Sequence, residues 1–461
     1  MAISAGPRQV RLLACVAYSP GMEQRSPQGT VPIKGLDISN YIVNINLYES
    51  VFDDTVSGSL TLSDTVGLPE YLPFVGVEYI LIAFSVDQGD ETPKEFRRIF
   101  RVVGLRDQEF TKNEERMFTV DIATSEFVTS VSGRVQKSYN GVTCSEGIQR
   151  ILSEEMGVSN DRMTDIEKTT FKIDAIIPNY TPLSAVNYFT LLALNPAEDS
   201  IFLFYETLEG FHFNSLRNLL SPPDVSVLPI FNVNEGGVSY AKTINESVAF
   251  NSIIRLAQER SFNVLEDIAG GVLRSRVLHL DFLARKYAFT DTNYTDTFEE
   301  SPHLSKFPVY PKNFDRVVNV NAKLFVLPSS DWSKDSKYVQ STQDRIDQDR
   351  LYRAIEKRNR QVKMLRHART TIELPGQADI RAGSVVIINY PSSRPLEDSI
   401  GPSTSSIPAN PSRYYSGAHL ITSVRHILTR TGVASLSYFM HLEACRDSFG
   451  SPLVEFPKGE D

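Results

Sequence analysis

The feature that most constrains the fold of this chain is an alternation of apolar and polar side chains with a period of two, which begins near residue 43. Val43, Ile45 and Leu47 alternate with Asn44 and Asn46. Because successive side chains of a β-strand point to opposite faces of a sheet, this pattern predicts a strand with one buried and one solvated face. Similar patterns recur near both ends of the chain, so we expect a β-rich protein.

Several more strand patterns follow before residue 130. They lie at 57–64, 77–86, 97–109 and 115–124. A turn at Asp53-Asp54 precedes the first of them, and the second is apolar on both faces, as in a central or covered strand. Because short strands separated by turn residues are typical of small antiparallel barrels and sandwiches, we expect residues 31–130 to form one or the other.

The middle of the chain has helical signals. Thr143 and Glu146 have the spacing of a capping box ahead of an apolar stripe. Thr181 and Pro182 are residue types preferred at the N-cap and at the first helical position. An apolar β-hairpin pattern follows this second helix. Residues 131–235 are therefore predicted to form an α+β unit.

Strand patterns dominate again towards the C-terminus. They lie at 271–287, 370–374, 384–390, 419–428 and 434–445. We expect residues 236–290 and 366–447 to form a second, discontinuous all-β unit. The segment 291–365 is predicted to be an insertion that ends in a charged, solvent-facing helix at 343–365. The remaining assignments are an N-terminal extension at 1–30 and a C-terminal tail at 448–461.

The composition excludes several classes of protein. Hydrophobic residues make up 41% and charged residues 22% of the 461 residues, as in ordinary globular proteins. The 47 basic and 56 acidic residues give a formal net charge of -9, so the chain lacks the basic excess of proteins that grip nucleic acid by its phosphates. We expect no specific nucleic-acid binding, although a mildly acidic wall is compatible with a conduit for DNA.

The cysteines and the apolar runs bear on the compartment of the protein. Cys15, Cys144 and Cys445 are odd in number, far apart and without a CxxC motif, so we expect free thiols in a reducing cytoplasm. The apolar segment 12–17 is too short for a signal peptide. No run approaches the ~20 apolar residues that cross a bilayer. We therefore expect a soluble protein with no membrane span.

The sequence has no recognisable motif for catalysis or cofactor binding. P-loop, GxGxxG, HExxH, GxSxG and EF-hand patterns are all missing from it. His419 and His426 lie seven residues apart on one expected strand and so should point to opposite faces, which excludes a shared metal ion. Paired carboxylates of the kind that glycosidases use occur at Asp53-Asp54, Glu154-Glu155 and Glu299-Glu300, without a glycosidase signature around them. We predict no catalytic, cofactor-binding or metal site, and no enzyme.

Three sets of segments resemble one family of structural proteins. They are DISNY (37–41), LYESVFDDTVSG (47–58) and LTLSD (60–64); YTPLSAVN (180–187) and FLFYETLEGFHFNSL (202–216); and LPG (374–376), AGSV (382–385), SGAHLI (416–421) and VRH (424–426). In this order they resemble the first tube-like barrel, the α+β domain and the second barrel of baseplate hub proteins of contractile-tailed bacteriophages. The segments 291–365 and 391–417 have no counterpart in this resemblance.

The resemblance implies a fold and a set of partners. The fold is a β-rich α+β multidomain protein with two tube-protein-like antiparallel β-barrel domains, an α+β domain and an insertion. The implied assembly is a homotrimer whose six barrels form a pseudo-sixfold ring, with barrel edges pairing between subunits. This ring would join the tail tube protein to the central spike protein, contact neighbouring baseplate proteins, and leave a channel for genome passage during ejection. The expected location is the tail baseplate of the virion, after synthesis in the host cytoplasm.

Alternative functions stay open at this stage. A hub of a related contractile injection system, such as a tailocin or a type VI-like machine, would have the same organisation. A tail-associated cell-wall hydrolase and a host-binding adhesin are the candidates from other classes. Aromatic and arginine side chains in the long loop 391–417 and in the C-terminal tail are typical of interfaces. The residues predicted to contact partners are Arg394, Tyr414, Tyr415, Pro452 and Phe456.

Overall fold

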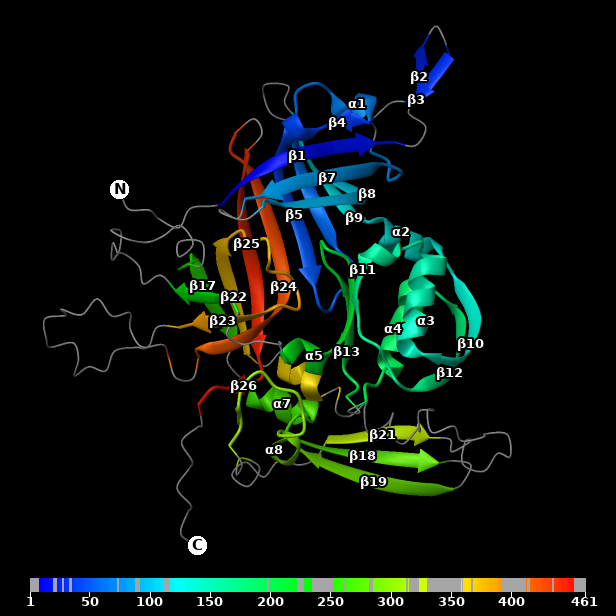
Figure 1. The fold of residues 1–461 in the computed structure, drawn as a ribbon, viewed down its shortest axis with the longest axis vertical. Helices are drawn as coiled ribbons and strands as arrows, with labels where there is room; N and C mark the ends of the chain where they lie inside the picture. Colours follow the sequence, from blue (N-terminus) through cyan, green and yellow to red (C-terminus); the bar gives the residue numbers. More distant parts are fainter. Residues whose placement is uncertain are drawn as a thin grey trace, which may run out of the picture.

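In the computed structural model, the chain forms a β-rich assembly of packed units, which confirms the predicted fold class (Figure 1). The residues that the structure describes are 8–19, 23–26, 29–32, 35–72, 74–87, 92–110, 116–196, 199–221, 228–233, 252–260, 263–281, 285–311, 314, 323–329, 358, 360–365, 368–390, 412, 415–432 and 435–451.

The first barrel is closed by eight strands. In order around the barrel they are β5 (Ile42–Ser50), β6 (Ser57–Asp64), β9 (Arg116–Thr124), β8 (Lys94–Phe110), β7 (Tyr79–Val86), β1 (Arg8–Tyr18), β25 (Ser435–Arg446) and β24 (Gly417–Arg430). All neighbours in this ring are antiparallel. The barrel therefore combines the N-terminal strands with the last long hairpin of the chain.

The second barrel uses the other half of the same hairpin. Its further strands are β15 (Ile230–Val233), β16 (Ser252–Ile253), β17 (Arg255–Arg260), β22 (Ala368–Pro375) and β23 (Val385–Asn389). The segment β16–β17 closes this barrel, because β16 pairs with β15 and β17 pairs with β22. Figure 1 shows β24 and β25 running through the middle of the molecule from one barrel to the other.

The two barrels share one hydrophobic core. Leu47 and Phe100 of the first barrel and Ile372 and Ile388 of the second belong to one continuous cluster of buried side chains. Leu208 of the α+β unit also belongs to this cluster. Because a shared core resists separation of its parts, we expect the barrels and the tip of the α+β unit to move together.

The α+β unit packs beside the barrels, as Figure 1 shows. Its elements are α2 (Ser125–Ser132), β10 (Val135–Thr143), α3 (Cys144–Arg150), the π-helical η2 (Ile151–Glu155), η3 (Asn160–Arg162), β11 (Met163–Ile166), β12 (Lys172–Tyr180), α4 (Pro182–Leu192), β13 (Phe202–Glu206), β14 (Phe211–Ser215) and α5 (Leu216–Leu220). Both predicted helix starts are present. Thr143 and Glu146 form a reciprocal capping box, and the Thr181 hydroxyl caps α4 with Pro182 in its first turn.

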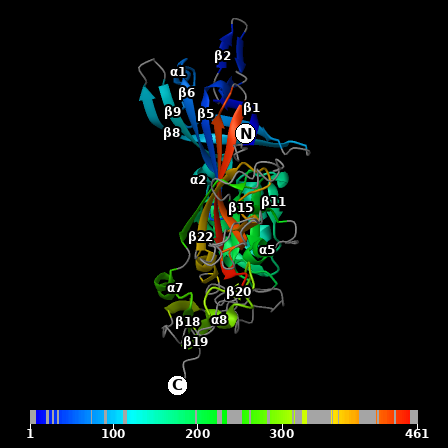
Figure 2. The same ribbon diagram turned by 90° about the vertical axis from the view of Figure 1, so that its left-hand side faces the viewer.

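A third unit lies at the end of the molecule opposite to the first barrel (Figure 2). It contains α7 (Val264–Gly270), β18 (Arg274–Asp281), β19 (Lys286–Asn293), α8 (Tyr294–Thr297), β20 (Phe307–Pro308), β21 (Lys323–Ser329) and β26 (Ser448–Phe449). The strands β19, β18 and β21 form a three-stranded sheet. The remaining short elements, near the first barrel, are β2 (Glu23–Ser26), β3 (Gly29–Pro32), β4 (Leu36–Asp37), η1 (Ser39–Tyr41) and α1 (Leu68–Tyr71).

Three segments differ from the sequence-based expectation. The N-terminal segment Arg8–Tyr18 is a barrel strand, because its inward residues Cys15 and Ala17 are fully buried. The strand Arg274–Asp281 belongs to the separate three-stranded sheet, outside the second barrel. The helical residues 360–365 are packed inside the molecule, since Met364 and Leu365 belong to two hydrophobic clusters. The rest of the expected charged helix lies outside the described residues, apart from residue 358.

The three cysteines are free and buried, as the sequence predicts. Burial raises the pKa of the Cys144 thiol to about 12 and raises that of Cys445 well above its usual value. Thiols with raised pKa values carry little thiolate at neutral pH and are unreactive. In the part of the chain that the structure describes, no helix is long and apolar enough to cross a membrane.

Candidate functional site: a buried joint between the folded units

The tip of the β13–β14 hairpin, residues 206–209, lies where the two barrels meet. Glu206 and Thr207 are completely buried there. A buried charged group is stable only when it is paired and hydrogen-bonded, so the surroundings of this hairpin tip decide how firmly the units are joined. We call the tip and its partners the joint.

Glu206 is at the centre of a buried charge cluster. Its Oε1 accepts a hydrogen bond of 2.6 Å from Nη2 of Arg98 in the first barrel and another from Arg162 in the α+β unit. Its Oε2 accepts from the backbone N–H of Val56 at 3.1 Å. Burial raises the pKa of Glu206 to about 7, against the attraction of the two guanidinium groups. Arg162 also pairs with Glu126, so the cluster contains two acids and two bases.

Glu49 on β5 connects all three units of the joint. Its Oε1 accepts from the N–H of Leu208 at 2.7 Å, and its Oε2 accepts from the N–H of Ala382 in the second barrel at 3.2 Å. Nε2 of His426, on the shared hairpin, lies 3.5 Å from Oε1. Burial opposes ionisation of Glu49, but His426 and the two amides outweigh it and lower the pKa of the carboxyl.

A second acid of the hairpin tip reaches the outer side of the joint. Glu209 pairs with Lys94 of the first barrel at 2.8 Å and with Arg381 of the second barrel. These side chains are partly exposed, so the pairs contribute roughly 0–1 kcal/mol each. Glu209 therefore helps to orient the hairpin tip between the two barrels and adds little to the stability of the fold.

Two glycines allow the close packing of the joint. A Cβ atom on Gly210 would lie 2.2 Å from Oγ1 of Thr164 and 2.4 Å from the carbonyl oxygen of Arg162. Gly383 has a φ of +88°, and a Cβ there would lie 2.3 Å from the hydroxyl oxygen of Tyr205. Both positions belong to the segments that carry the sequence resemblance, and the close approach gives the physical reason for a glycine at each.

Replacing Glu49 by glutamine is expected to lower the free energy of unfolding by about 2 kcal/mol. The side-chain NH2 group of the glutamine would face one of the two backbone N–H groups that Glu49 accepts from. That N–H group would then have no hydrogen-bond acceptor. Urea unfolding followed by circular dichroism measures the change. Glu443→Gln is the control, because the Arg369–Glu443 pair is partly exposed and should contribute less than about 1 kcal/mol. Equal effects of the two substitutions would contradict a special role of Glu49.

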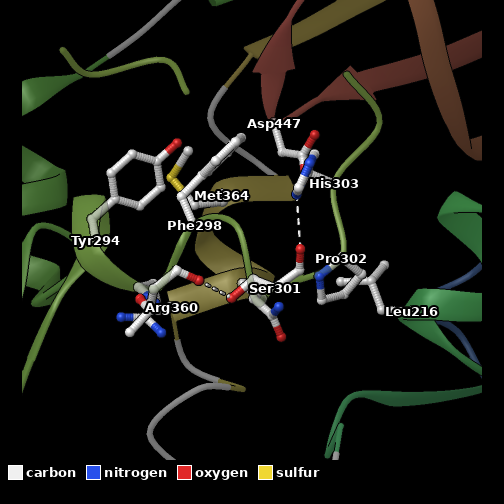
Figure 3. Close-up of a pocket in the computed structure, with 11 residues that line it drawn as sticks. Leu216, Tyr294, Phe298, Ser301, Pro302, His303, Arg360, Met364 and Asp447 are labelled. Carbon is white, nitrogen blue, oxygen red and sulfur yellow. Dashed lines mark hydrogen bonds between the residues drawn. The ribbon is translucent and has the colours of Figure 1, made fainter. Parts of the chain in front are cut away.

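A small cavity lies where the third unit meets the second barrel (Figure 3). Its volume is about 20 Å³, which is room for a single water molecule. Asp447 in its wall accepts a hydrogen bond from the N–H of Leu304 at 3.1 Å, and burial raises the pKa of this carboxyl. Nδ1 of His303 lies 2.7 Å from the carbonyl oxygen of Ser301, as Figure 3 shows. A cavity of this size is a packing feature and cannot hold a substrate.

The predicted partner-contact residues lie mostly beyond the reach of the structure. Arg394, Tyr414, Pro452 and Phe456 are outside the described residues. Tyr415 is 45% exposed, and its carbonyl oxygen accepts a hydrogen bond of 2.6 Å from Arg446. Its contact role stays a prediction.

The paired carboxylates have structural surroundings. Oδ2 of Asp54 accepts from the amide of Asn187 at 2.8 Å, and burial raises its pKa to about 6. Glu154 and Glu155 both accept from Lys137 on the surface of the α+β unit. Among the residues that the structure describes, no group of three or more potential ligands could hold a metal ion.

The sequence predicts that the two histidines of β24 point to opposite faces, and this prediction is wrong. Both are buried, with exposed fractions of 1% for His419 and 3% for His426. The pairing of β24 with β25 shifts register between Ile421 and Ser423, and this bulge reverses the alternation. His426 therefore reaches the joint, while Nδ1 of His419 bonds to the carbonyl oxygen of Gly417 at 2.8 Å. The joint itself has no local sequence signal, because its members come from distant segments.

A comparison with family models and with curated proteins finds no match. Among solved structures, the chain is similar to the tail protein from Neisseria meningitidis MC58, with 11% identity, coverage of 95% of this chain and 99% of that chain, and a TM-score of 0.49. It is similar to the 43 kDa tail protein of prophage MuSo2 from Shewanella oneidensis, with 10% identity, coverage of 94% and 98%, and a TM-score of 0.48. An E. coli component of the type VI secretion system has 9% identity, coverage of 88% and 73%, and a TM-score of 0.38.

Proposed function

We propose that this chain is a structural subunit of a tail baseplate hub, which forms a homotrimeric, pseudo-sixfold ring between the sixfold tail tube and the threefold central spike. The observation that carries the proposal is the pair of closed barrels joined by the shared β24–β25 hairpin, of which the first is antiparallel throughout and the second has parallel pairings on both sides of β15. Three copies would supply six barrels in a fixed geometry. Such a ring presents a sixfold surface on one side, while its other units keep threefold symmetry.

The ring contacts are proposed to be made by side chains. In the described part of the chain both barrels are closed, so their strands offer no free edges for the pairing between subunits that the sequence resemblance implies. The outer surface of the first barrel instead has exposed apolar side chains on β1 and β8, where Ile99 lies between Arg97 and Arg101 on the same face. Leu13, Ile99 and Val103 are 42%, 56% and 50% exposed, and Leu81 lies beside Ile99. We propose this surface as a subunit contact.

The joint supports this function mechanically. A hub that transmits force between a tube and a spike needs units that do not rotate against each other. The buried acids Glu49 and Glu206 bind all three units through charge-assisted hydrogen bonds, which have strict geometry. The proposed partners are the tube protein, the spike protein and neighbouring baseplate proteins, with DNA passing through the channel without specific binding.

The oligomeric state tests the proposal. Mass photometry and negative-stain electron microscopy should show threefold rings with an open channel at micromolar concentration. Ile99→Glu should shift the population from trimers to monomers by at least tenfold, because it places a charge in the proposed contact. Ile176→Glu is the matched control, since Ile176 is 74% exposed on the α+β unit and should leave the rings intact. Monomers of the unsubstituted chain under all conditions would refute the ring.

We also propose that the machine is a phage tail and that the chain has no enzymatic activity. A related injection machine would use the same ring with a different spike. We expect no clearing band in a peptidoglycan zymogram of the purified chain. A band that survives repurification would favour the hydrolase over the structural hub.

A further inference from the structure

The sheet β19–β18–β21 has one face open to solvent. Directly paired residues share a face, so Phe289, Leu278 and Val326 form one row across the three strands. Tyr287 and Leu324 lie on the same face in the neighbouring rows. The exposed fractions are 70% for Tyr287, 55% for Phe289, 53% for Leu324 and 51% for Val326. We call this surface the open face.

The charges of the open face are matched within it. Arg276 and Asp291 face each other across β18 and β19 and form two hydrogen bonds, of 2.6 Å and 2.7 Å. The guanidinium group also lies over the ring of Phe289, 5.6 Å from its centre. The two charges of this pair neutralise each other. A partner surface that complements the open face should therefore be neutral and apolar.

The topology of the sheet makes a bare face unusual. Strand β21 runs parallel to β18, and parallel strands are normally covered on both faces. The opposite face is covered, since Val277 on β18 is only 1% exposed. A covering layer is therefore expected over Tyr287 and Phe289.

The edges of the sheet indicate what kind of segment can bind. Among the strands that the structure describes, β19 and β21 each pair only with β18, so each has one unpaired edge. Pro328 in β21 has no N–H to donate, which makes that edge unsuitable for further pairing. Strand β19 contains no proline over Lys286–Asn293 and is the better edge for an added strand.

The area of the open face argues against a second copy of the chain as its occupant. Phe, Tyr and Trp side chains bury roughly 150–250 Å² each and Leu and Val side chains bury less, so the four half-exposed residues offer at most on the order of 400 Å². Two copies packed face to face would bury roughly 800 Å², below the ~1,200 Å² of stable specific interfaces. A partner that also pairs with an edge gains backbone hydrogen bonds in addition to this area.

We propose that the open face binds an extended segment of another tail protein, which adds as a strand to β19 and covers Tyr287 and Phe289 with apolar side chains. The proposal rests on the proposed place of the chain in a tail. The open face lies at the end of the molecule opposite to the first barrel, so the proposed ring contact leaves it accessible (Figure 2).

Hydrogen exchange tests the strand addition directly. In the free chain, every second amide of β19 faces away from β18, and we expect these amides to exchange rapidly. In purified tails that contain the chain, these alternate amides should be protected at least 100-fold, as a paired strand requires. A photo-crosslinking residue at position 287 (Tyr287→p-benzoylphenylalanine) should join the chain to a different tail protein in the same particles. Unchanged exchange of β19 would overturn the proposal.

Two variants and an isotope label separate the possible outcomes. Phe289→Lys should reduce incorporation into tails at least tenfold, while Leu265→Lys, at an 80% exposed position on α7, should not. Mixed light and heavy copies show whether the crosslink joins two copies of this chain, which would refute the different partner. Trimer formation is measured separately on the free Phe289→Lys chain. Loss of rings in the unsubstituted chain contradicts the hub, whereas intact rings with an unprotected β19 contradict only the added strand.

Discussion

Replacing Glu206 by alanine is expected to lower the free energy of unfolding by about 4 kcal/mol. The substitution leaves Arg98, whose side chain is only 11% exposed, without its carboxylate partner, while Arg162 keeps its pair with Glu126. It also removes the acceptor of the Val56 amide. Uncompensated buried charge is among the most costly defects in a protein, so this effect should exceed that of any exposed charge.

Chemical unfolding at pH 7.5 measures the change for Glu206→Ala. The matched control is Asp121→Ala, which breaks an exposed pair with Arg106 and should cost less than about 1 kcal/mol. We also expect the α+β unit to unfold before the barrels in Glu206→Ala, because the joint connects them. A single transition with an unchanged midpoint would show that the cluster contributes no stability.

Acid is expected to destabilise the protein through His419. Burial, with a smaller contribution from Arg446, lowers the pKa of His419 to about 3 from an ordinary value of 6.5. Because the folded chain resists protonation, the full contribution to stability is present above pH 6.5 and is lost as the pH falls towards 3. One proton corresponds to about 1.4 kcal/mol per pH unit, so the loss between pH 6.5 and 4 is about 3 kcal/mol.

The comparison of variants isolates this histidine from the acids that titrate in the same range. In His419→Gln, the unfolding free energy should decline less steeply between pH 6.5 and 4. The difference in slope should correspond to the uptake of about one proton fewer on unfolding. His441→Gln is the control, because it removes a histidine whose side chain is 38% exposed instead of buried. Identical slopes in the unsubstituted chain and in His419→Gln would disprove the assignment.

Local signals in the sequence predicted local structure well. The capping box of Thr143 and Glu146 and the N-cap at Thr181 depend on residues a few positions apart, and both are present in the structure. The alternation at Val43, Ile45 and Leu47 likewise marks strand β5. These patterns reflect the geometry of one element, so a single segment contains all the information.

Long-range structure was not predictable from the same patterns. Nothing near Arg8 indicates that the strand β1 pairs with Tyr438, more than 400 residues later in the chain. The bulge after Ile421 reversed the expected faces of the histidines, since alternation alone cannot reveal an extra residue. The joint combines Glu49, Glu206 and Ala382, whose proximity depends on how three units pack.

The shared hairpin sets the order in which the chain can fold during synthesis. Strand β1 leaves the ribosome before the rest of the barrel, but one of its two neighbours in the barrel is β25, which is made more than 400 residues later. The first barrel therefore stays an open sheet with exposed edges through most of translation. A ribosome that stops before residue 435 releases a chain with neither barrel complete, so only copies that include β25 can become building blocks of an assembly.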